Sequence, residues 1–142
     1  MPQVTDSPIF LWTAEYAVGV PRIDEEHQHL FALAGCLHKA MLEGKGKAIL
    51  SHLLTGLADY TRYHFEHEEE WMARIRYPDL RQHREEHDTL RAKVREMHAR
   101  LELGEVTMTI ELMQLMMEWL KRHIATSDRR IAGYMRANGL SQ

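Results

Sequence analysis

Residues 64–87 read HFEHEEEWMARIRYPDLRQHREEH, and this stretch decides the fold. It carries two pairs of metal-binding residue types at the spacing i, i+4, namely His64 with Glu68 and His83 with His87. Residues four apart on a helix differ in direction by only about 40°, so the two members of each pair face the same way. Pro78 stands between the pairs, where it disfavours helix at the residue before it and favours a new helix start. The stretch predicts two helices joined by a tight turn.

The same helical periodicity extends over most of the chain. Apolar residues recur with a period of about 3.6 in four segments, at about residues 24–43, 47–75, 79–103 and 109–127. Four apolar stripes with brief connections predict an all-α protein, an up-down-up-down four-helix bundle. We expect residues 1–22 to form an N-terminal arm that packs across the bundle through Phe10, Leu11 and Trp12. A short C-terminal helix should continue to Ala137.

Length and composition limit the functions of this chain. Its 142 residues fit one domain spanning residues 1–142. With 18 basic and 21 acidic residues the net charge is −3 and no basic block occurs, so nucleic acid is not an expected partner. No apolar stretch approaches the roughly 20 residues that span a bilayer, and the N-terminus lacks a signal-peptide pattern, so no membrane association is expected. The single cysteine, Cys36, fits a reducing compartment, and we expect a cytoplasmic protein.

Five of the ten histidines and two acidic residues lie on the inward stripes or beside them. These candidate ligands are His27, His64, Glu68, His83, His87, His123 and Asp128. A single histidine on an apolar face is usually a hydrogen-bonded core residue, but an apolar core cannot hold five of them without partners. Imidazole suits iron and zinc, and a carboxylate can link two cations. The set predicts a centre of two iron ions.

The predicted ligands divide unequally between the two ions. Both ions can share Glu68 and Asp128, and the histidines form a pair and a triplet: His27 with His64, and His83 with His87 and His123. The charges of two ferrous ions, two carboxylates and one bridging hydroxide nearly cancel, which favours their burial. One ion keeps a vacant position, which a small diatomic molecule can fill.

The sequence resembles the hemerythrins, specifically their bacterial single-domain type. The resemblance rests on Trp12, VGVPRIDEEHQHL (residues 18–30), HFEHEE (64–69), the YP of the turn, HREEH (83–87) and WLKRHIATSD (119–128). It implies a non-heme diiron centre with carboxylate and oxo or hydroxo bridges, in which Glu68 and Asp128 are the carboxylate bridges. His27 and His64 would hold the open iron, to which dioxygen binds end-on.

The function that this resemblance implies is reversible dioxygen binding, for oxygen storage, delivery or sensing, and not an enzyme activity. It also implies a dioxygen pocket lined by Trp119, Leu120 and Ile124, although these stripe residues equally suit a plain core. The alternative function is a diiron enzyme acting on peroxide or nitric oxide. The histidine-rich ligand set favours binding, because oxygen-activating enzymes use more carboxylates.

The spacing of His123 and Asp128 does not fit a regular helix. Five residues turn an α-helix by about 140°, so both side chains cannot face one site. We expect a π-bulge, a tightened turn or a helix break near residues 125–127.

The remaining histidines are predicted to lie outside the centre. His29 points about 200° away from His27 and should be solvated. His67 lies about 60° off the inward stripe, and we interpret it as a residue that supports a ligand or lies at the surface. Glu66, Glu69 and Glu70 are interpreted as an ordinary charged face, and Cys36 is expected on the outer face.

Another polar group is predicted farther along the bundle. His38 and His98 each follow an inward ligand by eleven residues and return to the same face, with His52 close by. We interpret these three histidines as a hydrogen-bonded layer, and the alternative is a secondary metal site.

Two enzyme motifs are weak. Residues 83–87 match H-x-x-E-H, the inverted zinc-protease pattern with Glu86 as base, but both histidines are already candidate iron ligands. A ferritin-like oxidase needs two Glu-x-x-His motifs, and the chain has only Glu26-x-x-His29, whose histidine points outward.

Overall fold

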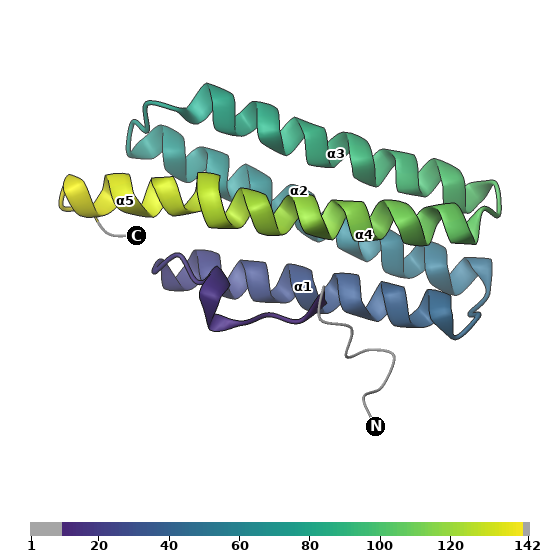
Figure 1. Ribbon diagram of the computed structural model, residues 1–142. Helices are drawn as coiled ribbons and strands as arrows, with labels where there is room; N and C mark the ends of the chain where they lie inside the picture. Colours follow the sequence, from purple (N-terminus) through teal and green to yellow (C-terminus); the bar gives the residue numbers. More distant parts are fainter. Residues whose placement is uncertain (1–9, 141–142) are drawn as a thin grey trace.

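The protein is described here by a computed structural model covering residues 10–140, without the side chains of residues 107 and 108. Four long helices lie alongside one another, each antiparallel to the next: α1 (Pro21–Leu42), α2 (Lys47–Arg74), α3 (Leu80–Glu102) and α4 (Val106–His123) (Figure 1). A π-helix, η4 (Ile124–Asp128), joins α4 to α5 (Arg129–Ala137), and a short 3-10 turn, η3 (Ala14–Tyr16), precedes α1. The all-α four-helix bundle with a short C-terminal helix is confirmed, and residues 10–140 contain no strand.

The helices end where the local sequence allows the chain to turn. Gly44 follows α1 with a φ of 72°, a left-handed conformation that costs glycine little. The amide of Lys45 then donates to the carbonyl of Ala40 at 3.0 Å, which closes the helix end. At the other end, Pro21 occupies the first turn of α1, where its missing amide hydrogen has no helical partner to lose. The helix therefore begins three residues before the expected position 24.

The turn between α2 and α3 is tied to α5. Tyr77 is buried there, and its ring meets the ring of Tyr134 edge-on with centroids 5.3 Å apart. The Tyr134 hydroxyl donates to the carbonyl of Ile75 at 3.2 Å. These contacts fix the end of the bundle at which α2 ends and α3 begins.

The N-terminal arm bridges α1 and α5. The Phe10 ring stacks on His38 of α1 at 4.4 Å, and the Trp12 ring meets Phe31 edge-on at 5.3 Å. From the other side, the Arg129 guanidinium donates to the carbonyl of Glu15 at 2.7 Å. The expected packing through Phe10 and Trp12 is found. For Leu11 the prediction was wrong, because its side chain is exposed.

Three further expectations concern the start of the arm, membrane association and the position of Cys36. Residues 1–9 of the arm lie outside the described residues. The expected lack of a signal peptide concerns this part of the chain. Within residues 10–140 no helix has the length and apolar character needed to cross a membrane. Cys36 is exposed on α1, as its phase on the helix predicts.

Candidate metal centre

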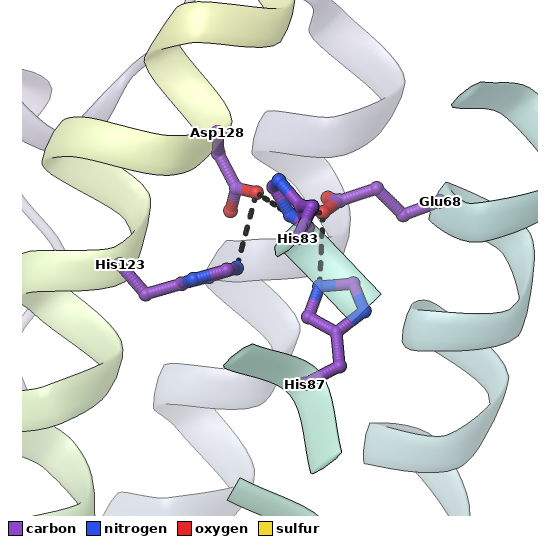
Figure 2. Close-up of side chains that lie close together, drawn as sticks. All are labelled: Glu68, His83, His87, His123 and Asp128. Atoms are coloured by element: carbon purple, nitrogen blue, oxygen red, sulfur yellow. Dashed lines mark hydrogen bonds and ion pairs between the residues drawn. The ribbon is translucent and has the colours of Figure 1, made fainter. Parts of the chain in front are cut away.

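The seven predicted ligands meet inside the bundle, although they come from five different elements. Two groups of donor atoms form, in each of which all donors lie within 4.8 Å of one another. The larger group contains Glu68, His83, His87, His123 and Asp128 (Figure 2), and the smaller contains His27, His64, Glu68 and Asp128. Both groups are buried. Glu68 and Asp128 belong to both, which is the arrangement required of two shared carboxylates.

The two shared carboxylates form the middle of the centre. The Oε1 atom of Glu68 lies 2.7 Å from Nε2 of His83 and 3.2 Å from Nε2 of His87. Asp128 reaches both groups, because its Oδ2 lies 3.0 Å from Nε2 of His27 and its Oδ1 lies 3.0 Å from Nε2 of His83. Carboxylates so placed can each offer one oxygen to either of two neighbouring cations.

Three further carboxylates hold the outer nitrogens of the histidine rings. Nδ1 of His64 donates to Glu26 at 2.7 Å, Nδ1 of His87 donates to Glu69 at 2.7 Å, and Nδ1 of His123 donates to Glu86 at 3.1 Å. A hydrogen bond of this kind fixes both the tautomer and the orientation of an imidazole that binds a metal through Nε2. The sequence does not predict that these three carboxylates support the ligands.

The His64 ring has a carboxylate oxygen near each of its two nitrogens, and this arrangement favours a cation between His64 and Glu68. Burial lowers the pKa of His64 despite its carboxylate neighbours, so the ring is neutral and carries one proton. That proton is donated from Nδ1 to Glu26, so the lone pair on Nε2 faces Oε2 of Glu68 at 3.4 Å. Two lone pairs facing each other in a buried space are unfavourable unless a cation lies between them.

Unsatisfied buried atoms mark the same place. Six buried atoms of the centre lack a hydrogen bond of good geometry, although histidine nitrogens lie 3.0–3.3 Å from the Asp128 oxygens. They are both ring nitrogens of His27, Oε2 of Glu68, Nε2 of His123 and both carboxylate oxygens of Asp128. Buried polar atoms without a partner are rare, because each costs roughly 1–3 kcal/mol. Nitrogen and carboxylate oxygen are donor types that iron accepts. The residues therefore fit a pair of iron ions.

In the metal-free protein, protons partly supply the missing positive charge. Burial and Asp128 oppose ionisation of Glu68, but contacts with His83 and His87 outweigh them and lower its pKa to about 2. Burial also opposes protonation of His83 and His123. The carboxylates outweigh it, with Asp128 foremost, and raise the pKa of His83 to about 9 and that of His123 to about 10. A metal cation that enters must displace these protons.

The π-helix explains how His123 and Asp128 share the centre. Residues 124–128 form η4, one of the three alternatives expected from the sequence. A π-turn contains more residues than an α-turn, so a five-residue separation brings the two side chains to the same face. Nε2 of His123 consequently lies 3.3 Å from Oδ1 of Asp128.

Comparison with known proteins agrees with this donor set. The model of the hemerythrin HHE cation-binding domain matches residues 18–134. The chain belongs to the hemerythrin family. A bacteriohemerythrin of Pseudomonas paraeruginosa is 32% identical over 127 residues, covering 89% of this chain and 80% of that protein. One of Clostridium acetobutylicum is 29% identical over 126 residues, covering 85% of this chain and 97% of that protein.

A solved structure supports the same conclusion about the fold. Wild-type hemerythrin superposes with a TM-score of 0.78 at 27% identity, covering 87% of this chain and 95% of that one. Hemerythrins are oxygen-binding proteins with a non-heme diiron centre, and the two donor groups of this chain fit such a centre.

The residues expected to line a dioxygen pocket differ in burial. Leu120 and Ile124 are buried apolar residues, one about a turn before His123 and the other directly after it in the chain. Trp119 is half-buried, and its ring stacks on His123 with centroids 4.9 Å apart and planes inclined by 10°. Trp119 therefore also holds one of the candidate ligands in place.

Glu69 requires a correction. We interpreted it as part of a charged face, but its side chain is only 13% exposed and accepts hydrogen bonds from His87 and from Arg91, the latter at 2.8 Å. Glu26 and Glu86 were not recognised as partners of ligands either. No local signal marks them: Glu26 and Glu86 each precede a ligand histidine in the chain, but the rings that they hold, His64 and His123, lie on other helices. A histidine that binds a metal needs an acceptor for its other nitrogen.

The remaining histidines do not belong to either donor group. His67 lies beside the centre, with Nδ1 2.7 Å from Oε2 of Glu26, so it supports a ligand indirectly. His29 is exposed as expected. His38 is buried against Phe10, and within the described residues no metal-binding group includes His38, His52 or His98. Glu86 is not free to act as the base of a zinc protease, because it accepts hydrogen bonds from His123 and from Ser127.

Proposed function

We propose that this chain binds dioxygen reversibly at two iron ions held by the seven buried donors, and that it stores, delivers or senses oxygen. The observation that carries the proposal is the unequal division of nitrogen donors around two shared carboxylates. The iron ions, when bound, supply the electrons that dioxygen takes up on binding. The protein side chains hold the ions, orient the ligands and keep water away.

The residues assigned to each iron follow the two donor groups. We assign His83, His87 and His123 to one iron and His27 with His64 to the other, and Glu68 and Asp128 would be shared by both ions; the spacing of these donors supports this assignment. The ion held by two histidines would have one protein ligand fewer, and so would be the one open to dioxygen. Glu26, Glu69 and Glu86 keep the Nε2 atoms of three ligands turned inward.

Reversible binding also requires that water be kept away from the centre. We propose that Leu120 and Ile124 form the apolar wall of the dioxygen pocket and that Trp119 closes it; the burial of Leu120 and Ile124 and the stacking of Trp119 on His123 support this. An apolar wall offers no hydrogen bond to water or to an incoming proton, which slows loss of the bound molecule as a reduced oxygen species. We also propose a cytoplasmic location, which the single exposed cysteine supports.

A visible absorption spectrum tests the function. The iron-loaded, reduced protein is measured before exposure to air, after exposure, and after removal of oxygen. We expect a charge-transfer band that appears with oxygen and disappears on its removal over repeated cycles. Irreversible bleaching, or steady consumption of peroxide or nitric oxide beyond the amount of protein, would contradict a binding function.

A further inference from the structure

A surface groove between α1 and α2 leads toward the ligands of the two-histidine iron. Its volume is about 530 Å³, and its lining includes Arg22, Glu25, Glu26, His29, Tyr60 and Tyr63. This volume is in the range of sites that bind small organic molecules. We call it the tyrosine groove.

Aromatic rings form a continuous row beside the tyrosine groove. The His29 ring lies 4.2 Å from the Tyr60 ring, and the Tyr60 ring lies 5.5 Å from that of Tyr63. The Tyr63 ring is 6.1 Å from that of His67, with planes inclined by only 23°. Tyr63 is 48% exposed, so its ring is available to a bound molecule. Aromatic surfaces of this kind favour a planar conjugated ligand.

One carboxylate joins the tyrosine groove to the metal centre. Glu26 lines the groove, although its side chain is nearly buried. Its Oε1 accepts the proton of His64 at 2.7 Å, and its Oε2 lies 2.7 Å from Nδ1 of His67. A molecule in the groove would therefore be one hydrogen-bonded carboxylate away from a ligand of the two-histidine iron.

The other outer carboxylates are less suited to such contact. Glu69 is covered by two arginines, since Arg91 lies 2.8 Å and Arg84 3.3 Å from its oxygens. The pocket beside Glu86 and Trp119 measures only about 110 Å³. A second groove of about 500 Å³ lies between α2 and α3, but no aromatic side chain lines it. Of these three pockets, only the tyrosine groove has a large volume, aromatic side chains in its lining and a carboxylate hydrogen-bonded to a candidate ligand.

We propose that the tyrosine groove binds a reduced flavin, which returns the oxidised centre to the ferrous state that binds dioxygen. This inference rests on the diiron function proposed above. The isoalloxazine ring stacks on the exposed ring of Tyr63, and its N–H groups donate to the exposed carboxylate of Glu25. With Arg22 opposed by Glu25 and Glu26, the lining has no excess of positive charge, which suits the neutral ring of a flavin.

The electron count of this step is balanced. One reduced flavin releases two electrons and two protons and becomes oxidised flavin. Two ferric ions accept one electron each and become ferrous. The protons leave the ring nitrogens for Glu25 and then for water, because the groove is open to solvent. Glu26, His64 and His67 provide the short connection for the electrons and are positioning residues.

The test uses the iron-loaded protein in its oxidised state without oxygen. Reduced riboflavin is mixed with it, and the loss of the visible iron band gives the rate of reduction. Tyr63→Leu removes the exposed ring, and we expect reduction by riboflavin to slow about three- to tenfold, as the loss of a stacking contact predicts. Arg95→Gln, in the groove between α2 and α3, is the matched control and should leave this rate unchanged.

Two further measurements separate flavin binding from a general effect on the centre. Oxidised riboflavin is titrated into the oxidised protein, and quenching of flavin fluorescence should report binding that Tyr63→Leu weakens by a similar factor. Dithionite, which has no ring, should reduce wild type and Tyr63→Leu at the same rate. His67→Leu should leave flavin binding intact and slow reduction at saturating flavin.

The outcomes distinguish this inference from the proposed function. Equal riboflavin rates in wild type and Tyr63→Leu would overturn it, as would an equal slowing with dithionite. Specific effects of Tyr63→Leu in a protein that does not bind oxygen reversibly would leave the flavin site standing and reject the oxygen-binding function. Reversible oxygen binding with no riboflavin effect would do the opposite.

Discussion

His123 and Asp128 are separated by five residues, yet Nε2 of His123 lies 3.3 Å from Oδ1 of Asp128. The π-helix at residues 124–128 makes this possible, because it adds one residue to a turn without rotating the helix that follows. Asp128 thereby reaches both donor groups. If the number of residues sets the direction of Asp128 relative to His123, the identity of residues 124–127 should matter less than their number.

The first prediction concerns the length of this turn. Deletion of Thr126, an exposed residue, leaves His123 and the aspartate four residues apart on a regular helix, which keeps them about 40° apart. We expect the deleted protein to retain about two iron ions per chain. Insertion of one alanine after Thr126 should rotate Asp128 by about 100° and remove at least one ion.

Iron content per chain, measured after loading and desalting, checks this prediction. Circular dichroism of both variants shows whether the bundle is intact. If the deletion variant is folded but loses iron as the insertion variant does, the π-helix contributes more than spacing.

The second prediction concerns Glu69 and its neighbour. Glu69 accepts the Nδ1 proton of His87, whereas Glu70 is exposed and lies 3.7 Å from Arg74. Glu69→Ala should weaken iron binding about 10- to 100-fold, the usual effect of losing a hydrogen-bond partner of a metal ligand. Glu70→Ala, one residue away, should change it little. Competition with a chelator measures both affinities, and similar values for the two variants would contradict the assigned role of Glu69.

The third prediction concerns pH. In the metal-free protein the pKa values of His83 and His123 are raised to about 9 and about 10, so both histidines carry protons at neutral pH. Iron must displace these protons, so its apparent affinity should rise as the pH is raised from 6.5 toward 9. Anaerobic addition of ferrous iron in weak buffer with a pH indicator should show release of about two protons per chain. Release of none would show that these histidines are already neutral.

The same shifts predict the stability of the metal-free fold. A raised histidine pKa stabilises the fold fully below the unfolded value of about 6.5, and this contribution is lost as the pH rises through about 9 to 10. The lowered pKa of Glu68, about 2, stabilises the fold above the unfolded value of about 4.3 and is lost as the pH falls toward 2. Burial lowers the pKa of His64 and His38, so their contribution to stability is lost as the pH falls below about 6.5. Urea unfolding of metal-free protein should therefore show greatest stability near about pH 6.5.

The fourth prediction concerns the apolar wall. Ile124 is fully buried, so Ile124→Ala should lower the free energy of unfolding by about 2–5 kcal/mol through lost burial and a cavity. The cavity should also admit water and accelerate oxidation of the oxygenated protein in air. Leu115→Ala, at an exposed position of α4, is the control and should change stability by no more than about 0.5 kcal/mol. An unchanged oxidation rate in Ile124→Ala would remove Ile124 from the dioxygen pocket.

The fifth prediction concerns the buried histidine away from the centre. His38 stacks on Phe10, and burial lowers its pKa, so it is a neutral core residue. The double variant His38→Gln, His98→Gln should bind the same amount of iron as the wild type. A loss of bound metal would reveal the secondary site that the sequence left as an alternative.

The sequence by itself determined the helices and the inward direction of the candidate ligands. Both follow from local periodicity: a 3.6-residue repeat places His64 and Glu68, or His83 and His87, on the apolar face whatever that face later packs against. The misfit of His123 and Asp128 was also visible, because it is a matter of angle along one helix.

Only the tertiary structure decided which side chains support those ligands. Glu69 and Glu70 are adjacent and chemically identical, and no local pattern distinguishes them, because the difference is the His87 ring that α3 places beside α2. The same holds for Glu26, whose partners His64 and His67 lie on another helix. Hydrogen bonds between helices depend on how the helices pack, and periodicity within one segment carries no information about that distance.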